Sequence, residues 1–341
     1  PLHVMAGRAA AAAFDLVREG SPSAIRAAVG PAQASFRDCL GCSLLFAAAR
    51  RDTDPTDALE VCRYLIEELG LEVDLKAGEA SLCQTPLFYA AHYGCPEVAT
   101  LLIDRRAEAD RKDSNAQTPL FWAAAGGNHS VLEVLLARGA DPGHLDWNGQ
   151  TALFYAVKDD ALEHMLCAKA LLSSPRGGAA LACVRSDKLH SQTAMFYAAV
   201  HASVDSCALL LEHQCQVDYV DDNGQSVLFY AAAKARNDCV DFLLDRASDA
   251  NLRDRVGQTA LFFAVQGNQL ETCKLLVLKG NADPHATSDT GLSPASLVLE
   301  HGRPQELVAF FRTHAGVVGA VSSSRPGRPP RRTASAALAE T

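Results

Sequence analysis

One short pattern recurs along most of the chain: a Thr or Ser leads into a Leu-Phe pair, or its counterpart, and an alanine-rich stretch follows. The eight copies begin at Ser43, Thr85, Thr118, Thr151, Thr193, Ser226, Thr259 and Ser293, at spacings of 42, 33, 33, 42, 33, 33 and 34 residues. A sustained period near 33 residues indicates a fold built from stacked copies of one small unit. This repeat limits the possible folds more than any single motif does.

The copy over residues 118–150 shows how one unit is built. Thr118 is predicted to cap a helix that begins at Pro119, where the missing N–H costs nothing. The glycines at 126–127 predict the end of this helix, since glycine readily adopts a positive φ. A second helix carries apolar residues at helical spacing, namely Val131, Leu132, Leu135 and Leu136. Asn148-Gly149 predicts a hairpin-like bend, and stacking is needed to bury the apolar faces.

The stretch "TPLFWAA…GN…VLEVLLARGADP" resembles the ankyrin repeat, which has T-P-L-H-x-A at the same place. The resemblance covers roughly residues 43–316. The period, the helix caps, the glycine positions and the Leu-Leu pair all agree with the family's pattern. It implies an all-α fold, an ankyrin-repeat solenoid of helix-turn-helix units with short hairpin loops. We expect a degenerate N-terminal capping unit over residues 1–42, the array over 43–316 and a disordered basic tail over 317–341.

The chain departs from the family at one repeated position. Phenylalanine replaces the family's histidine at Phe46, Phe88, Phe121, Phe154, Phe196, Phe229 and Phe262. In the family that histidine ties neighbouring repeats together by hydrogen bonds, which Phe cannot do. We expect the Phe rings to fill a stiffer, more apolar seam between repeats, where aromatic pairs add ~0.5–1.5 kcal/mol beyond their buried area.

Two units have 42 residues. The first is lengthened at residues 50–58, between its helices, and at 68–80; the second is enlarged at 173–190, after its second helix. Insertions in repeat arrays map to loops and often shape a binding site. Neutral loop growth is the alternative.

Composition restricts the partners. The formal net charge is −9, and because the tail contributes +3, the rest of the chain carries −12. We therefore do not expect a nucleic acid partner, since a protein that binds phosphate backbones needs clustered Lys and Arg. No apolar run reaches the ~20 residues of a membrane span.

The cysteines indicate a compartment. Eleven are scattered along the chain, four of them within apolar helical patterns: Cys62, Cys207, Cys239 and Cys273. This is typical of buried, reduced thiols rather than of a disulfide framework. We expect an intracellular protein, most readily a cytoplasmic one, and the nucleus is the alternative.

The tail contains one candidate phosphorylation site. Arg331 and Arg332 precede Ser335 at a spacing that basophilic kinases accept; a chance match is the alternative.

The known catalytic signatures are absent from the sequence: it has no H-E-x-x-H, phosphate-binding loop, G-x-G-x-x-G or G-x-S-x-G. Cys39 and Cys42 form one C-x-x-C without the second pair that a zinc site needs. The adjacent carboxylates at 159–160 and 221–222 are typical of solvated turns. Paired aromatics such as Phe154-Tyr155 recur with the repeat and indicate core packing. We expect no enzyme activity, no cofactor and no metal.

The resemblance also implies where a partner binds, because ankyrin arrays use the groove formed by their first helices and hairpin tips. Carried over by position, the candidate residues are Tyr93, Leu145, Trp147, Asn148, Lys158, Asp159, His201, Asp222, Arg253 and Arg255. Trp147 stands out, since Trp is enriched among interface hot spots and a turn offers it little core. With Tyr93 and Leu145 it is expected to form an apolar anchor; packing onto the neighbouring hairpin is the alternative.

These observations predict a monomeric protein–protein interaction scaffold or adaptor without catalysis. The alternative is the regulatory or substrate-recruiting portion of a larger enzyme or channel, which the Pro1 start leaves open. The sequence does not identify the partner.

Overall fold

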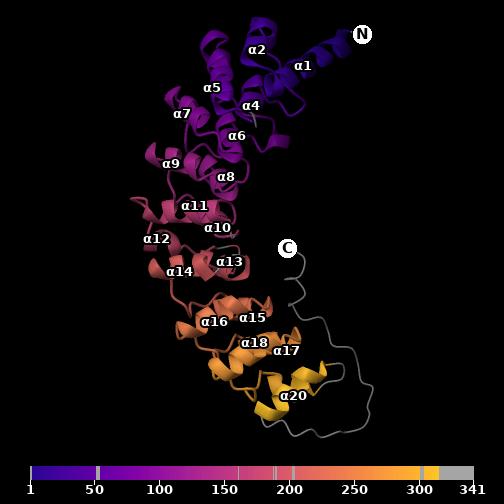
Figure 1. Ribbon diagram of the computed structural model, residues 1–341, viewed down its shortest axis with the longest axis vertical. Helices are drawn as coiled ribbons and strands as arrows, with labels where there is room; N and C mark the ends of the chain where they lie inside the picture. The colour runs from indigo at the N-terminus through magenta and orange to yellow at the C-terminus, as the bar shows by residue number, and fades with distance from the viewer. Residues whose placement is uncertain are drawn as a thin grey trace.

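The computed structural model describes residues 2–50, 54–159, 161–186, 188, 190–201, 204–299 and 303–314, with side chains from residue 9 onward. Helices are the only regular elements in these ranges, and β pairing there is limited to the isolated bridges Ser186–Gln192 and Val220–Ser226. The helices are stacked in pairs along one long axis (Figure 1). The predicted all-α solenoid is confirmed.

Every repeat contributes a first helix that begins directly after its conserved Thr or Ser. These helices are α4 (Leu44–Ala49), α6 (Pro86–Tyr93), α8 (Pro119–Ala125), α10 (Ala152–Ala156), α13 (Ala194–His201), α15 (Val227–Ala233), α17 (Ala260–Gln266) and α19 (Pro294–Val298). Each packs against the first helix of the next unit, which makes a continuous layer. At the end of α8, Gly127 has a φ of +66° but Gly126 does not, so one of the two predicted glycines provides the positive φ.

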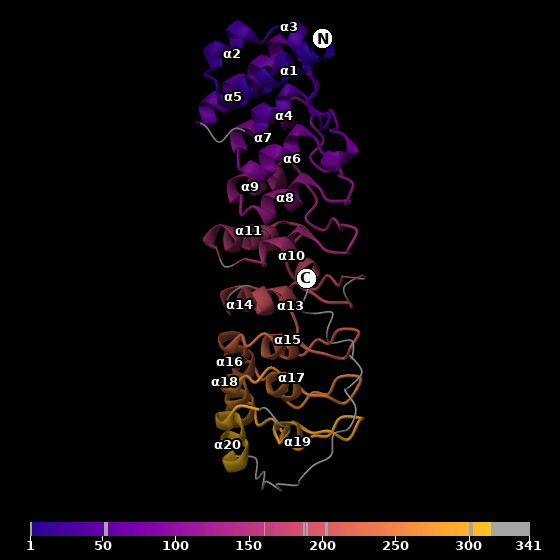
Figure 2. The ribbon, with the colours of Figure 1, turned by 90° about the vertical axis from the view of Figure 1, so that its right-hand side faces the viewer.

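The second helices form a parallel layer. They are α5 (Pro55–Arg63), α7 (Pro96–Asp104), α9 (His129–Ala137), α11 (Leu162–Ser173), α14 (Val204–Glu212), α16 (Asn237–Asp245), α18 (Leu270–Lys274) and α20 (Gln305–His314). Two of them, α5 and α18, continue into single π-helical turns, η1 (Tyr64–Glu68) and η3 (Leu275–Lys279). In Figure 2 this layer lies on one side of the first helices, and the loops project on the other.

The N-terminal residues extend both layers. The helices there are α1 (Leu2–Glu19), α2 (Pro22–Ala28) and α3 (Pro31–Ala34). Helix α1 packs on α4, and α2 packs on α5, as successive repeats do. Val17 and Ile25 are fully buried in these contacts, so the core continues beyond the first recognisable repeat.

The repeated Phe residues lie in the core between units, as predicted. Each is at most 2% exposed, and five of them meet an aromatic ring of the following unit edge to face. These pairs are Phe46–Tyr89, Phe121–Tyr155, Phe154–Tyr197, Phe196–Tyr230 and Phe229–Phe263, with centroids 5.3–5.8 Å apart. A chain of aromatic contacts therefore links consecutive repeats.

The predicted helix cap at Thr118 is only half right. Thr118 occupies the N-cap position with an extended backbone, but its side chain makes no capping hydrogen bond. Six of these repeat hydroxyls are buried without a hydrogen-bond partner among the residues that the structure describes: those of Ser43, Thr85, Thr118, Thr151, Ser226 and Thr259. Phe three residues later offers no donor or acceptor, so a hydroxyl next to it has no polar side chain to bind. Among the seven copies whose cap the structure describes, Ser293 alone caps as expected, accepting from Ser296 N.

Polar ties between repeats come instead from the start of the second helix. Asn128 donates from Nδ2 to the carbonyls of Ala91 (2.8 Å) and His92 (2.7 Å), at the end of α6. Gln269 makes the equivalent bond to the carbonyl of Ala233 at 2.9 Å. These side chains satisfy C-terminal carbonyls of the preceding first helix, which otherwise have no helical partner.

The two long units differ from simple loop growth. The first carries a 3₁₀ turn, η2 (Glu79–Ser81), and the second contains a short helix, α12 (Ala179–Ala182), where a loop was expected. Leu181 and Ala182 of α12 are buried, so this insert adds to the core. The contact between α10 and α13 at this unit is the least extensive of all adjacent first-helix pairs.

Candidate interaction surface

Four of the hairpins are each organised by one buried carboxylate. At residues 146–150, Asp146 Oδ1 accepts from the backbone N–H groups of Asn148 (2.8 Å) and Gln150 (2.9 Å). Its Oδ2 accepts from the Tyr155 hydroxyl at 2.8 Å. Gln117 Nε2, from the preceding hairpin, donates to the same hydroxyl at 2.7 Å. Carboxylate bonds of this kind are among the stronger ones in proteins, so the hairpin tip is held firmly against its own repeat.

The same arrangement recurs in other units. The carboxylates Asp113, Asp146, Asp221 and Asp254 are all buried, and each accepts two backbone N–H bonds within its hairpin. Asp221 also accepts from the Tyr230 hydroxyl at 2.6 Å. The Asp221-Asp222 pair is thus divided between a structural, buried carboxylate and an exposed one. Burial, and then the neighbouring carboxylate, raise the pKa of Tyr155 and of Tyr230.

Backbone hydrogen bonds join successive tips. Trp147 N donates to Asn115 O at 3.1 Å, and Arg255 N donates to Asn223 O at 2.9 Å. Asp222 N donates to His190 O at 2.8 Å, which continues the series through the second long unit. The tips therefore form a continuous edge along the solenoid, seen in Figure 2 as the projecting side.

Trp147 lies on this edge and is 64% exposed. Its ring has Lys188 Nζ at 6.0 Å from the centroid, at the outer limit of a cation–π contact. Leu145, two residues earlier, is 44% exposed. Asn148 extends the tip: it is exposed, and its carbonyl accepts a hydrogen bond from the Ser186 hydroxyl of the next unit. Most of the Trp147 ring is thus available to another molecule.

Large apolar side chains gather along the same edge. Nine of them are at least 39% exposed among the residues that the structure describes. Six lie in hairpins: Leu40, Leu145, Trp147, Val220, Val256 and Leu292. Leu162, Leu278 and Leu299 lie elsewhere. We call Leu145, Trp147, Val220 and Val256, which recur on successive or nearby hairpins, the apolar edge.

The predicted charged tip residues are exposed, and two of them, Asp222 and Arg253, already make side-chain hydrogen bonds. Asp222 Oδ1 accepts from the Ser191 hydroxyl at 2.9 Å. Arg253 donates from Nη2 to Thr287 O at 2.6 Å and from Nε to Gly257 O at 3.2 Å. Arg255 is exposed at the tip and bonds through its backbone to the preceding hairpin. Arg253 therefore braces the edge, while the Arg255 guanidinium projects from it.

The remaining predicted residues lie at the ends of first helices and form two groups. Tyr93 is half-buried in α6, in ring contact with Tyr89 and His92 and with the Arg50 guanidinium 5.3 Å from its centroid. No ring contact between described residues joins Tyr93 to Trp147. The structure thus brings Leu145 and Trp147 together on one tip and places Tyr93 at the end of α6.

Lys158, Asp159 and His201 belong to the second group, at the ends of α10 and α13, and all three are exposed. Burial lowers the pKa of His201, and the charges of Lys158, Lys234 and Arg236 lower it further. Three neighbouring units thus bring basic groups together around His201. The repeat position also places Lys234 at the end of its first helix, whereas the contribution of Arg236 depends on the stacking and has no local signal.

Of the other predicted residues, Ser335 lies outside the described residues. Cys39 is exposed and Cys42 buried, and the four cysteines predicted to be buried are fully so. Among described side chains, no group of three or more His, Cys, Asp or Glu could hold a metal ion. Within the same residues, no helix has the length and apolar character to cross a membrane.

Comparison with known proteins agrees with this architecture. The family model described as "Ankyrin repeats (3 copies)" matches residues 10–113, 101–181, 163–254 and 214–288. The crystal structure of the human ASB11 ankyrin repeat domain matches with a TM-score of 0.57 and 22% sequence identity, over 66% of this chain and 97% of that one. A search of curated protein sequences finds no match. The helix pairs, the projecting hairpins and the family matches together show that the chain belongs to the ankyrin-repeat family.

Proposed function

We propose that this chain is a monomeric, non-catalytic scaffold or adaptor that binds a partner protein along its hairpin tips and the adjoining ends of its first helices. Ankyrin repeats are generally protein–protein interaction modules. The observation that carries the proposal here is the apolar edge. It places Trp147, the type of residue most enriched in interface hot spots, on a tip held by the Asp146 network.

The surface combines an apolar anchor with charged neighbours. Trp147 and Leu145 supply exposed apolar area, Lys188 lies on the next tip, and Asp222 and Arg255 follow on the two tips after that. Since the tips are tied to one another through their backbones, little ordering is required on binding, which favours affinity. The proposed working unit is the array over residues 43–316, with residues 1–42 as its capping unit.

The test is affinity capture with the full chain and two variants. Leu145→Ala/Trp147→Ala removes the anchor, and Leu278→Ala, which truncates an exposed leucine on η3, is the matched control. We expect the double variant to lose at least 90% of a captured partner, since truncating a hot spot costs about 2 kcal/mol or more. Equal recovery with the wild type and with both variants would contradict the proposal.

A further inference from the structure

The first repeat lacks an aromatic side chain that other repeats have. In the regular units an aromatic residue lies nine positions after the hairpin carboxylate, as Tyr155 follows Asp146 and Tyr230 follows Asp221. In these two cases the tyrosine hydroxyl donates to the carboxylate's second oxygen, at 2.8 Å and 2.6 Å. In the first repeat, Ala47 occupies this position relative to Asp38.

Asp38 organises its hairpin in the same way as the later carboxylates. Its Oδ1 accepts from Leu40 N and Cys42 N, both at 2.9 Å, and Asp38 N donates to Cys42 O at 3.1 Å. Its Oδ2 accepts no hydrogen bond from a nitrogen or oxygen donor among the described residues. The buried Cys42 thiol, a weak donor, lies beside the carboxylate, whose charge contributes to raising the pKa of the thiol after burial.

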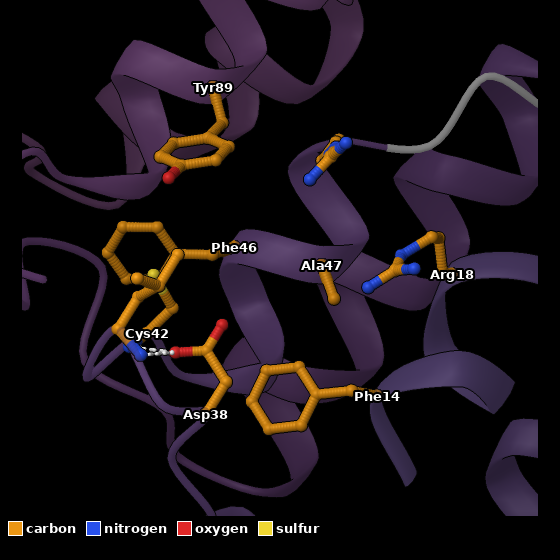
Figure 3. Close-up of a pocket in the computed structure, with 9 residues that line it drawn as sticks. Phe14, Arg18, Asp38, Cys42, Phe46, Ala47 and Tyr89 are labelled. Carbon is orange, nitrogen blue, oxygen red and sulfur yellow. Dashed lines mark hydrogen bonds between the residues drawn. The ribbon is translucent and has the colours of Figure 1, made fainter. Parts of the chain in front are cut away.

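A cavity lies where the missing ring would be. It measures about 40 Å³ and is lined by Phe14, Asp38, Phe46 and Ala47, among others. At roughly 10–15 Å³ for one water-sized sphere, it has room for about three, which is part of a six-membered ring, and because the pocket opens to solvent the rest of a ring would lie at its open side. Figure 3 shows the second oxygen of Asp38 pointing away from the Cys42 amide, toward the space between Phe46, Ala47 and Phe14.

The walls match those around the tyrosines of later repeats. Tyr155 is held between a carboxylate and the edge-to-face ring of Phe121 in the preceding unit. In the first repeat, Asp38 provides the carboxylate, and Phe14, on the preceding helix α1, provides an aromatic wall. In later units this position holds a phenol twice, an indole at Trp122 and a phenyl ring at Phe263, so an aromatic ring is the group this kind of site accommodates.

The mouth of the cavity is basic. Arg18 and Arg50 line it, and the Arg18 Nε is buried without a hydrogen-bond partner in the described part of the chain. The Arg18 guanidinium reaches a carboxylate oxygen of Asp15 only at 3.8 Å. Residues 315–341 contain no Phe, Tyr or Trp, so that segment cannot supply the ring. A ring from another polypeptide, flanked by acidic residues, would complement both the cavity and its mouth.

We propose that this cavity, which we call the first-repeat pocket, binds a tyrosine side chain of a partner protein, with acidic residues beside the tyrosine. The phenol ring packs against Phe14 and Phe46, and its hydroxyl donates to Asp38 Oδ2. Arg18 and Arg50 face the flanking carboxylates. The pocket is separate from the apolar edge, so this inference does not depend on the function proposed above.

The test uses the full chain and a fluorescently labelled peptide, Gly-Glu-Tyr-Glu-Gly, with the matching Phe peptide. We expect saturable binding by fluorescence anisotropy and about a tenfold preference for Tyr over Phe, the value of one hydrogen bond to a charged group. Asp38→Asn should reduce this preference severalfold. Ala47→Tyr, which inserts the ring that later repeats have, should weaken binding at least tenfold and raise the melting temperature.

Two further variants keep the outcome clear. Leu145→Ala/Trp147→Ala should bind the peptide like the wild type, and Ala47→Val is the substitute if Ala47→Tyr does not fold. Binding that is unchanged in Ala47→Tyr and Ala47→Val overturns the proposal, as does no binding by the wild type at millimolar peptide. Self-association that Ala47→Tyr abolishes, without peptide binding, would also overturn it and identify a second copy as the occupant.

Discussion

The hydroxyl of Thr118 is a buried polar group with no hydrogen-bond partner, beside Phe121, where the family has a histidine. Because removing such a group avoids its desolvation cost, we expect Thr118→Val to leave the free energy of unfolding unchanged or to raise it by up to about 1 kcal/mol. Urea denaturation followed by circular dichroism measures this. Ser293→Ala is the contrasting variant: it removes a real cap and should cost about 1 kcal/mol. A clear loss of stability in Thr118→Val would mean that its hydroxyl is bonded.

Cysteine reactivity is the second property that depends on single residues. Burial raises the pKa of Cys273 to about 12, and that of Cys167 to about 12 with a contribution from Glu163, so both thiols stay protonated at neutral pH. Cys39 and Cys183 are exposed. In a timed reaction with a thiol reagent read by mass spectrometry, we expect Cys39 and Cys183 to be labelled first. Cys167 and Cys273 should react only after unfolding, and early labelling of either would contradict the packing described here.

Among the structural elements, the seam between first helices carries the Phe ladder. Phe154→His places a polar ring where Phe154 is 1% exposed and meets Tyr197 at 5.5 Å. We expect it to lower the free energy of unfolding by roughly 2–4 kcal/mol and to lower the melting temperature, through lost apolar burial and the desolvation of a polar ring of which the Thr151 hydroxyl can pair with only one nitrogen. Phe154→Leu, which loses the ring without adding polarity, should cost less. An unchanged or raised melting temperature for Phe154→His would refute the apolar seam.

The hairpin network predicts a pH dependence. The pKa values of Tyr155 and Tyr230 are raised above the ordinary 10.0, so the folded protein holds these protons more tightly than the unfolded chain does. The resulting stability is complete below pH about 10 and is lost as the pH rises above it. Tyr155→Phe/Tyr230→Phe should be less stable at pH 8, but its stability should decline less steeply between pH 10 and 12. Equal slopes in denaturation series would contradict this network.

How far the sequence predicts these elements depends on what repeats. The period predicts the helix pairs and the bend at Gly149, because these depend on residues close together in the chain. It does not predict the Asp146–Tyr155–Gln117 network, since Gln117 lies 38 residues from Tyr155 and meets it only by stacking. It also misses α12, because an insert that occurs once has no period to compare. The first-repeat pocket has one signal in the sequence, because Ala47 replaces the aromatic residue of later repeats. That signal can be interpreted only once the structure shows the hairpin that Asp38 organises.

At the scale of the whole molecule, stability in a repeat array is the sum of unit and interface contributions, and the interface between α10 and α13 is the least extensive. Helix α12 lies in this unit with Leu181 2% exposed. We expect Leu181→Ala to lower stability by about 2–5 kcal/mol. Hydrogen exchange should accelerate first around α10, α11, α13 and α14. Leu162→Ala, at an exposed leucine of α11, is the control, and uniform acceleration along the array would show that the junction is not a separate weak point.

The arrangement of the tips is also a property of the whole stack, because their backbones are bonded from unit to unit and their exposed apolar residues share one edge. The central claim is that a partner protein binds this edge. The most direct measurement is site-specific photo-crosslinking in lysate, with benzoylphenylalanine at position 147 in the full chain and, as the matched control, at position 278. The account predicts a discrete crosslinked partner from position 147 and none from position 278. The same products from both positions, or none from position 147, would contradict it.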